Sequence, residues 1–258
     1  MATEKELLAA RLFFRAVFPI IKVILHDDPK MNKRFENVKA EVQFIAKDEK
    51  GPLGAWLIFN NGEFSVDYGI CANPDITFSF KSVKKMNDML AGKPVIPSIK
   101  GITKIALLVK ILSLLLSLKI LMPNARPKDK MKKKLKVKLS FYMITTALSQ
   151  YNKGGDPDMV KWTTKQPDRI YQISVEGEDI AAYLRVKAGN SKAGRGFYTR
   201  KRPFLHMKFH GADGALAVLL RDAEFVDAVS KGYVSVEGAP EYAAQLNDFM
   251  QRIQAMLT

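Results

Sequence analysis

The sequence is short of cysteine, histidine and acidic residues, and it lacks the usual catalytic motifs. Its single cysteine, Cys71, excludes an intramolecular disulfide framework and fits a reducing compartment. It contains no glycine-rich phosphate loop, no Gly-x-Ser-x-Gly elbow and no recognisable pair of catalytic carboxylates. We therefore predict that the protein is not an enzyme and that it needs no cofactor.

Three histidines are too few for an obvious metal site. His206 and His210 are four residues apart, which on a helix would suggest a pair of ligands. The surrounding apolar period is two, so we place both on the outer face of a strand and predict no metal.

Basic residues outnumber acidic ones by 41 to 26, a formal net charge of +15. Such a charge favours anionic partners, whether nucleic acid, anionic lipid or acidic protein. Nucleic acid is disfavoured because the sequence shows no zinc spacing, no aromatic RNA-binding motif and no helix-turn-helix signature. The N-terminus carries Glu4 and Glu6 where an export signal would be basic, so we expect a cytoplasmic protein, with peripheral membrane attachment open.

The chain contains an internal repeat at an offset close to half its length. Asp28-Pro29 recurs as Asp156-Pro157, at an offset of 128 residues. Further matches pair 54–62 with 181–189, 74–80 with 203–209, and Lys100-Gly101 with Lys231-Gly232. Four matches in the same order favour a duplication, although two unrelated domains with similar turns remain an alternative.

The first half reads as a long helix followed by strands and a helix, and the second half reads as strands, a helix, a strand and a last helix. The expected helices are 3–26 with a kink at Pro19, 82–90, 211–220 and 240–257. The expected strands are 38–46, 55–59, 76–80, 205–209 and 233–237. This segregation of strands and helices predicts an α+β fold.

The second half carries the most specific pattern. It reads Y-L-R-V-K-A-G (183–189), P-F-L-H-M-K-F (203–209) and K-G-Y-V-S-V-E-G (231–238), followed by a closing amphipathic helix. The order resembles the sterol carrier protein 2 domain, and G-A-W-L-I-F-N-N-G (54–62) and D-I-T-F-S-F (75–80) resemble it in the first half. The resemblance covers about residues 35–122 and 165–258 and rests on apolar patterning and glycine spacing.

This resemblance implies two tandem domains, each an antiparallel-rich sheet covered by helices. It also implies an apolar cavity for a sterol, a fatty acyl chain or another lipid. We expect the first domain at 1–127, a lysine-rich linker at 128–138 and the second domain at 139–258.

The segment Ile102–Met122 departs from the family pattern. It is almost entirely apolar and takes the place where a strand after Gly101 is expected. Lys104, Lys110 and Lys119 interrupt it too often for a spanning helix. Three interpretations stay open: a buried core helix, a wall or lid over a lipid cavity, and a membrane-inserted helix.

We predict that the first domain holds the larger apolar pocket and that the second acts mainly as scaffold. The predicted lipid-binding residues are Trp56, Phe78, Met86, Met89, Leu90, Ile105, Val109, Leu112 and Leu116. The predicted core of the second domain contains Phe209, Leu216, Leu219, Leu220, Phe249 and Ile253.

The lysine run at 128–138 has three interpretations: a solvated linker, a charge-guarded edge strand, and a patch on an anionic membrane. The predicted membrane-surface residues are Lys130, Lys132, Lys133, Lys134, Lys136 and Lys138.

The sequence thus favours a non-enzymatic protein that binds or transfers lipid. The alternative is a structural or regulatory module with filled cores that binds a protein partner. An enzyme acting on a steroid-like substrate would need convergent polar groups in a pocket, and the sequence shows none that can be assigned.

Overall fold

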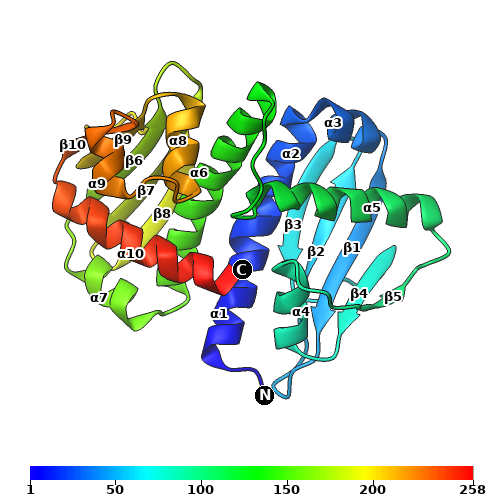
Figure 1. Ribbon diagram of the computed structural model, residues 1–258. Coiled ribbons are helices and arrows are strands. Elements are labelled where there is room, and N and C mark those ends of the chain that lie inside the picture. The colour runs from blue at the N-terminus through cyan, green and yellow to red at the C-terminus, as the bar shows by residue number, and fades with distance from the viewer. Residues whose placement is uncertain (258) are drawn as a thin grey trace. The chain divides into compact units, whose positions relative to one another are not determined.

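The computed structural model describes residues 1–257, which fold into two compact units (Figure 1). One unit comprises Met1–Lys119 and the extreme C-terminus, and the other comprises Ile120–Ala255. Each contains one five-stranded mixed sheet and several helices. The protein is therefore a two-domain α+β protein, as the sequence predicted.

The first unit opens with consecutive helical turns and continues into its sheet. Its elements are α1 (Glu4–Leu12), η1 (Phe13–Val17), η2 (Phe18–Ile20), α2 (Ile21–Asp27), α3 (Pro29–Phe35), β1 (Lys39–Ala46), β2 (Leu53–Asn60), β3 (Glu63–Tyr68), β4 (Ile76–Phe80), α4 (Val83–Leu90), β5 (Ser98–Lys100) and α5 (Ile105–Ser117). A single turn, η3 (Leu118–Leu121), follows α5.

The first helix begins where its sequence predicts, and its α-helical pattern is interrupted around Pro19. The Thr3 hydroxyl accepts a hydrogen bond from the Glu6 amide, and the Glu6 carboxylate accepts one from the Thr3 amide, which completes a capping box. Pro19 lies in the short 3₁₀ turn η2, because its missing N–H interrupts the α-helical ladder.

The second unit repeats this arrangement. Its elements are α6 (Lys130–Lys153), α7 (Pro157–Thr164), β6 (Arg169–Val175), β7 (Ile180–Lys187), β8 (Asn190–Arg195), β9 (Leu205–Phe209), α8 (Gly211–Leu219), α9 (Phe225–Ser230), β10 (Val234–Gly238) and α10 (Pro240–Leu257).

The two sheets share one topology. The strand order is β3-β2-β1-β4-β5 in the first and β8-β7-β6-β9-β10 in the second. In each sheet the central pair, β1 with β4 or β6 with β9, is parallel and the other neighbours are antiparallel. The repeated Asp-Pro also has one role, since Asp28 and Asp156 cap α3 and α7. The predicted duplication is confirmed in the order and pairing of the strands.

One of the predicted repeat matches is wrong. Lys100-Gly101 does not correspond to Lys231-Gly232, because β5 ends just before Gly101 and its counterpart β10 ends at Gly238. Both glycines have positive φ, +82° and +104°. A Cβ on Gly101 would lie 2.1 Å from the carbonyl oxygen of Asp75, and one on Gly238 would lie 2.0 Å from that of Phe204, each the residue just before the neighbouring strand. The first unit therefore keeps its fifth strand, and α9 is an addition in the second unit that shifts the numbering.

The lysine run is a helix, neither a linker nor an edge strand. Asp129 caps α6 by accepting a hydrogen bond from the Lys132 amide at 3.0 Å. Leu135, Val137 and Leu139 alternate like a strand, yet all three are buried. They can be, because α6 contacts β7, β8, α7 and α8 and is enclosed on most sides.

A buried glutamine occupies the same place in both sheets. The Gln43 side-chain amide donates to the carbonyls of Phe44 and Ala55, both at 2.9 Å, and its oxygen accepts from the Cys71 amide at 2.5 Å. Gln172 makes the matching bonds to Ile173, Ala182 and Tyr198 in the second unit. Each glutamine ties its sheet to the loop that follows the third strand.

The helices cover one face of the first sheet. The Phe18 ring lies 5.0 Å from Phe44 on β1, and Phe44 stacks on Phe78 of β4 at 4.9 Å between ring centroids. Trp56 pairs with Gln43 across the β1–β2 ladder, so its side chain lies on the opposite face from Phe44.

Candidate lipid-contact surface

Helix α5 is anchored to the first unit by one side only. Ile111 and Leu114 are completely buried there. The Arg34 guanidinium of α3 donates a hydrogen bond to the Ser113 hydroxyl, which lies on α5. α5 crosses in front of the sheet and passes beside α3 (Figure 1). Only part of the apolar surface of α5 is therefore buried, and the rest is exposed to solvent.

The other side of α5 is apolar and exposed. Its exposed fractions are 59% for Ile102, 68% for Ile105, 59% for Val109, 41% for Leu112 and 58% for Leu116. These residues recur at alternating steps of three and four, so they follow a single stripe along the helix and the turn before it. We call these five residues the apolar stripe. A contiguous apolar row of this kind marks an interaction surface more often than a scattered exposed leucine does.

The surroundings of the apolar stripe are basic. No aspartate or glutamate occurs between Asp88 and Asp129. The same stretch carries Lys93, Lys100, Lys104, Lys110, Lys119, Arg126 and Lys128. Three of these cations are paired with carboxylates: Lys93 with Asp88, Lys104 with Asp75 and Arg126 with Asp222. The stripe thus combines large apolar side chains with a local excess of positive charge.

The structure brings four of the nine predicted lipid-binding residues together on this stripe. They are Ile105, Val109, Leu112 and Leu116, and they face outward. The other five lie elsewhere. Phe78 and Met86 are buried in the core, Met89 and Leu90 are half-buried on α4, and Trp56 is half-buried on the opposite face of the sheet. The nine residues do not wall one common cavity.

Lys136 is not a membrane-surface residue, contrary to the prediction. It is 2% exposed, and its ammonium donates hydrogen bonds to the carbonyls of Met122 and Ala125 at 2.8 and 2.7 Å. Burial, with a smaller contribution from Arg126, lowers the pKa of Lys136 to about 8. This lysine fastens the segment before α6 to the helix itself.

Two further lysines of the run are engaged in ion pairs inside the second unit. Lys133 lies 2.7 Å from Asp213, and Lys134 lies 2.6 Å from Glu178. Lys130 and Lys132 are exposed, whereas Lys138 is half-buried. The helical spacing therefore distributes these lysines around α6 rather than gathering them in one patch.

The predicted core of the second unit is largely confirmed. Phe209, Leu216, Phe249 and Ile253 are buried. The remaining two members, Leu219 and Leu220, are half-buried at the end of α8.

His206 lies on β9 as predicted, but His210 follows the strand and precedes α8, and the two histidines have separate partners. The His206 Nε2 atom lies 2.8 Å from the Ser174 hydroxyl, and His210 pairs with Glu176. Within residues 1–257, no group of three or more His, Cys, Asp or Glu side chains is arranged to hold a metal ion. Over the same residues, none of the helices has the length and apolar character needed to cross a bilayer.

Comparisons with known proteins leave the family open. No family model matches the chain, and no curated protein matches it either. Among solved structures, a double mutant of the sec-alkyl sulfatase PisA1 is 13% identical with a TM-score of 0.28, over 56% of this chain. The stereoselective inverting sec-alkylsulfatase Pisa1 from Pseudomonas sp. is 14% identical with a TM-score of 0.26, over 55% of this chain. Both matches span 28% of the other chain, and similarity at this level assigns neither a fold nor an activity.

Proposed function

We propose that this protein is a non-enzymatic lipid-binding protein that contacts lipid through the apolar stripe of α5. The observation that carries the proposal is the exposure of the five apolar side chains of the stripe on a helix whose opposite side is anchored in the fold. Each unit also has the element order that the resemblance to the sterol carrier protein 2 domain implies, with strands, a helix, a further strand and a closing helix. That order supports the family assignment, which remains part of the proposal.

The size of the stripe indicates a reversible attachment. Complete burial of one large aliphatic side chain contributes about 1.5–3 kcal/mol. The five side chains are about half exposed, so covering them would contribute roughly 4–7 kcal/mol in total. This is comparable to a single acyl anchor, which by itself binds membranes only marginally. A second contribution is therefore needed, and lysines near an anionic surface provide about 1 kcal/mol each.

The charge around α5 favours an anionic lipid surface over a second copy of this chain. Self-association through the stripe would bring two acid-free, lysine-bearing segments together, with repulsion between like charges. An anionic bilayer offers both an apolar layer and opposite charge at the required depth. An acidic protein partner, as in the alternative of a structural module, is one outcome that the following experiment separates.

Liposome co-sedimentation tests the proposal. The full chain should sediment with vesicles of phosphatidylcholine and phosphatidylserine, and more weakly with phosphatidylcholine alone. Leu112→Lys combined with Leu116→Lys should abolish sedimentation while the circular dichroism spectrum stays unchanged, because both side chains are exposed. Val226→Lys is the matched control, since Val226 is 76% exposed on α9 of the second unit.

Equal sedimentation of the double variant and the wild type would refute the role of α5. Failure of the wild type to bind either vesicle, together with no uptake of fluorescent fatty acid or sterol and no lipid seen by native mass spectrometry, would refute lipid binding altogether. It would leave the protein-binding module as the better description.

A further inference from the structure

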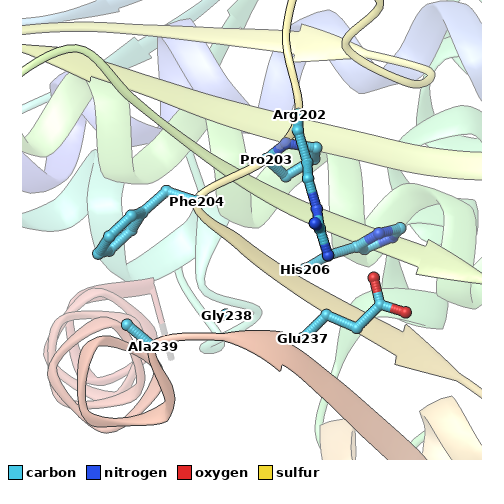
Figure 2. A pocket seen from close by; sticks show the side chains of 7 residues that line it. All are labelled: Arg202, Pro203, Phe204, His206, Glu237, Gly238 and Ala239. Carbon is cyan, nitrogen blue, oxygen red and sulfur yellow. The ribbon is translucent and has the colours of Figure 1, made fainter.

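A small pocket in the second unit lies where β9 begins and β10 ends. Its volume is about 470 Å³, within the range of sites that hold small molecules. It is lined by Arg202, Pro203, Phe204, His206, Glu237, Gly238 and Ala239 (Figure 2). The loop before β9 brings the first three residues, and the turn into α10 brings the last.

The walls of this pocket are held by close packing. Gly238 approaches the Phe204 carbonyl so closely that a Cβ would lie 2.0 Å from its oxygen. The Arg169 guanidinium lies 3.9 Å from the centre of the Phe204 ring, and Tyr242 packs edge-on against that ring at 5.0 Å. The Phe204 side chain is thus held in place by Arg169 and Tyr242 in the absence of a ligand.

The polar groups of the pocket differ in how far they are already satisfied. Glu237 is neutralised by an ion pair with Lys208. His206 engages Ser174, which is 3% exposed, and burial together with Lys208 lowers the pKa of His206, so its imidazole is neutral at pH 7. Arg202 is exposed and makes no hydrogen bond or ion pair within the described residues. Its side chain is directed toward His206 and Glu237 (Figure 2), and the pKa of Glu237 is lowered by Lys208 and, to a smaller degree, by the charge of Arg202.

We propose that this pocket binds a small carboxylate with an apolar body, such as an aromatic or short aliphatic acid. The unpaired guanidinium of Arg202 leaves a net charge of one after Lys208 and Glu237 cancel, which suits a single negative charge. The planar fork of an arginine matches a carboxylate in geometry. Phe204 and Ala239 line the side of the pocket away from Arg202 (Figure 2) and would contact the apolar body, while His206 donates a hydrogen bond from Nδ1 when the Ser174 hydroxyl donates to Nε2.

The first unit indicates that the fold does not require these residues. By strand register, Thr77 stands in the place of His206 and Lys100 in the place of Glu237. Ile45 stands where the second unit has the buried Ser174. The proposed site therefore belongs to the second unit alone and is separate from the apolar stripe.

The experiment is a titration of the ¹⁵N-labelled full chain with sodium benzoate, followed by amide shifts. Benzoate should move the amides of His206 and Gly238 saturably. Arg202→Gln should weaken the affinity at least about tenfold, the loss expected when a charge-assisted bidentate contact is removed. Arg200→Gln, an exposed arginine two residues away that does not line the pocket, should leave it unchanged.

Three outcomes would overturn the proposal: no saturable shift with benzoate, unchanged affinity in Arg202→Gln, and tighter binding of inorganic phosphate than of benzoate. The spectrum of each variant reports its folding directly. Liposome binding by Arg202→Gln should remain as in the wild type, so failure at this pocket is distinguishable from failure of lipid contact at α5.

Discussion

Replacing Gln43 by alanine should destabilise the first unit by about 3–5 kcal/mol. The side chain is 2% exposed, and its amide makes two hydrogen bonds of 2.9 Å to the carbonyls of Phe44 and Ala55. Two such bonds contribute about 1 kcal/mol each. The Cys71 amide would in addition lose its acceptor inside the protein, at about 1–3 kcal/mol.

Gln43→Glu removes the hydrogen-bond donor of the side chain but keeps an acceptor, so it tests the two roles of Gln43 separately. The carboxylate can still accept from the Cys71 amide, but it turns a second oxygen toward carbonyl oxygens where an N–H group stood. A buried carboxyl in this place should have a pKa above its ordinary value of about 4.3. The deficit relative to the wild type should therefore be largest at neutral pH and shrink as the pH falls.

Urea unfolding followed by fluorescence and circular dichroism measures both effects. Gln172→Ala tests the same contacts in the second unit, and Gln251→Ala on the exposed side of α10 should change stability by less than about 0.5 kcal/mol. Losses below about 1 kcal/mol in both Gln43→Ala and Gln172→Ala would refute the role assigned to these bonds. So would a Gln43→Glu variant that is as stable as the wild type at neutral pH.

Three further substitutions test the packing and the buried charge. Gly238→Ala should destabilise the second unit strongly, because its Cβ would lie 2.0 Å from a carbonyl oxygen. Gly177→Ala, whose Cβ has open space around it, should show only the smaller cost of a φ of +72°. Thermal unfolding compares the two variants. Phe249→Ala removes a buried ring and should cost about 3–5 kcal/mol by urea unfolding, with liposome binding retained. The pKa of Lys136 is lowered to about 8 in the folded protein, whereas an ordinary lysine has a pKa of about 10.4. Between these two pH values the unfolded chain binds more protons than the folded one, so the free energy of unfolding of the wild type should rise with pH there. Lys136→Met should remove that rise, and an unchanged slope would exclude this lysine as its source.

The duplication was accessible from sequence because turns and caps leave local signatures. Asp28-Pro29 and Asp156-Pro157 both begin a short helix, as capping chemistry requires. The lysine run was misread because its alternating leucines and valine resemble a strand, and only the elements packed around α6 reveal why a helix can bury them all. The missing counterpart of Gly101 was hidden by the additional helix α9, which breaks the constant offset between the copies.

The candidate sites depend on strand register, which a single sequence does not specify. Trp56 and Phe78 were placed in one pocket, but the pairing of Gln43 with Trp56 and of Phe44 with Phe78 puts them on opposite faces. The outward direction of the apolar stripe was equally hidden, since nearly every position of α5 is apolar and periodicity cannot distinguish its anchored side from its free side.

The parallel strand at the centre of each sheet has a consequence for how the chain folds. β1 pairs with β2 on one side and with β4 on the other, and β4 is synthesised only after β2 and β3. The edge of β1 that later pairs with β4 is therefore unpaired until β4 has left the ribosome. A second sheet of identical topology in the same chain then offers β9 as a wrong partner for β1. Exchange would set Phe44 beside Met207 in place of its stacked partner Phe78. Sequence differences between the two cores therefore disfavour strand exchange between the units. Making the two copies more alike should increase misfolding, even where each unit alone becomes more stable.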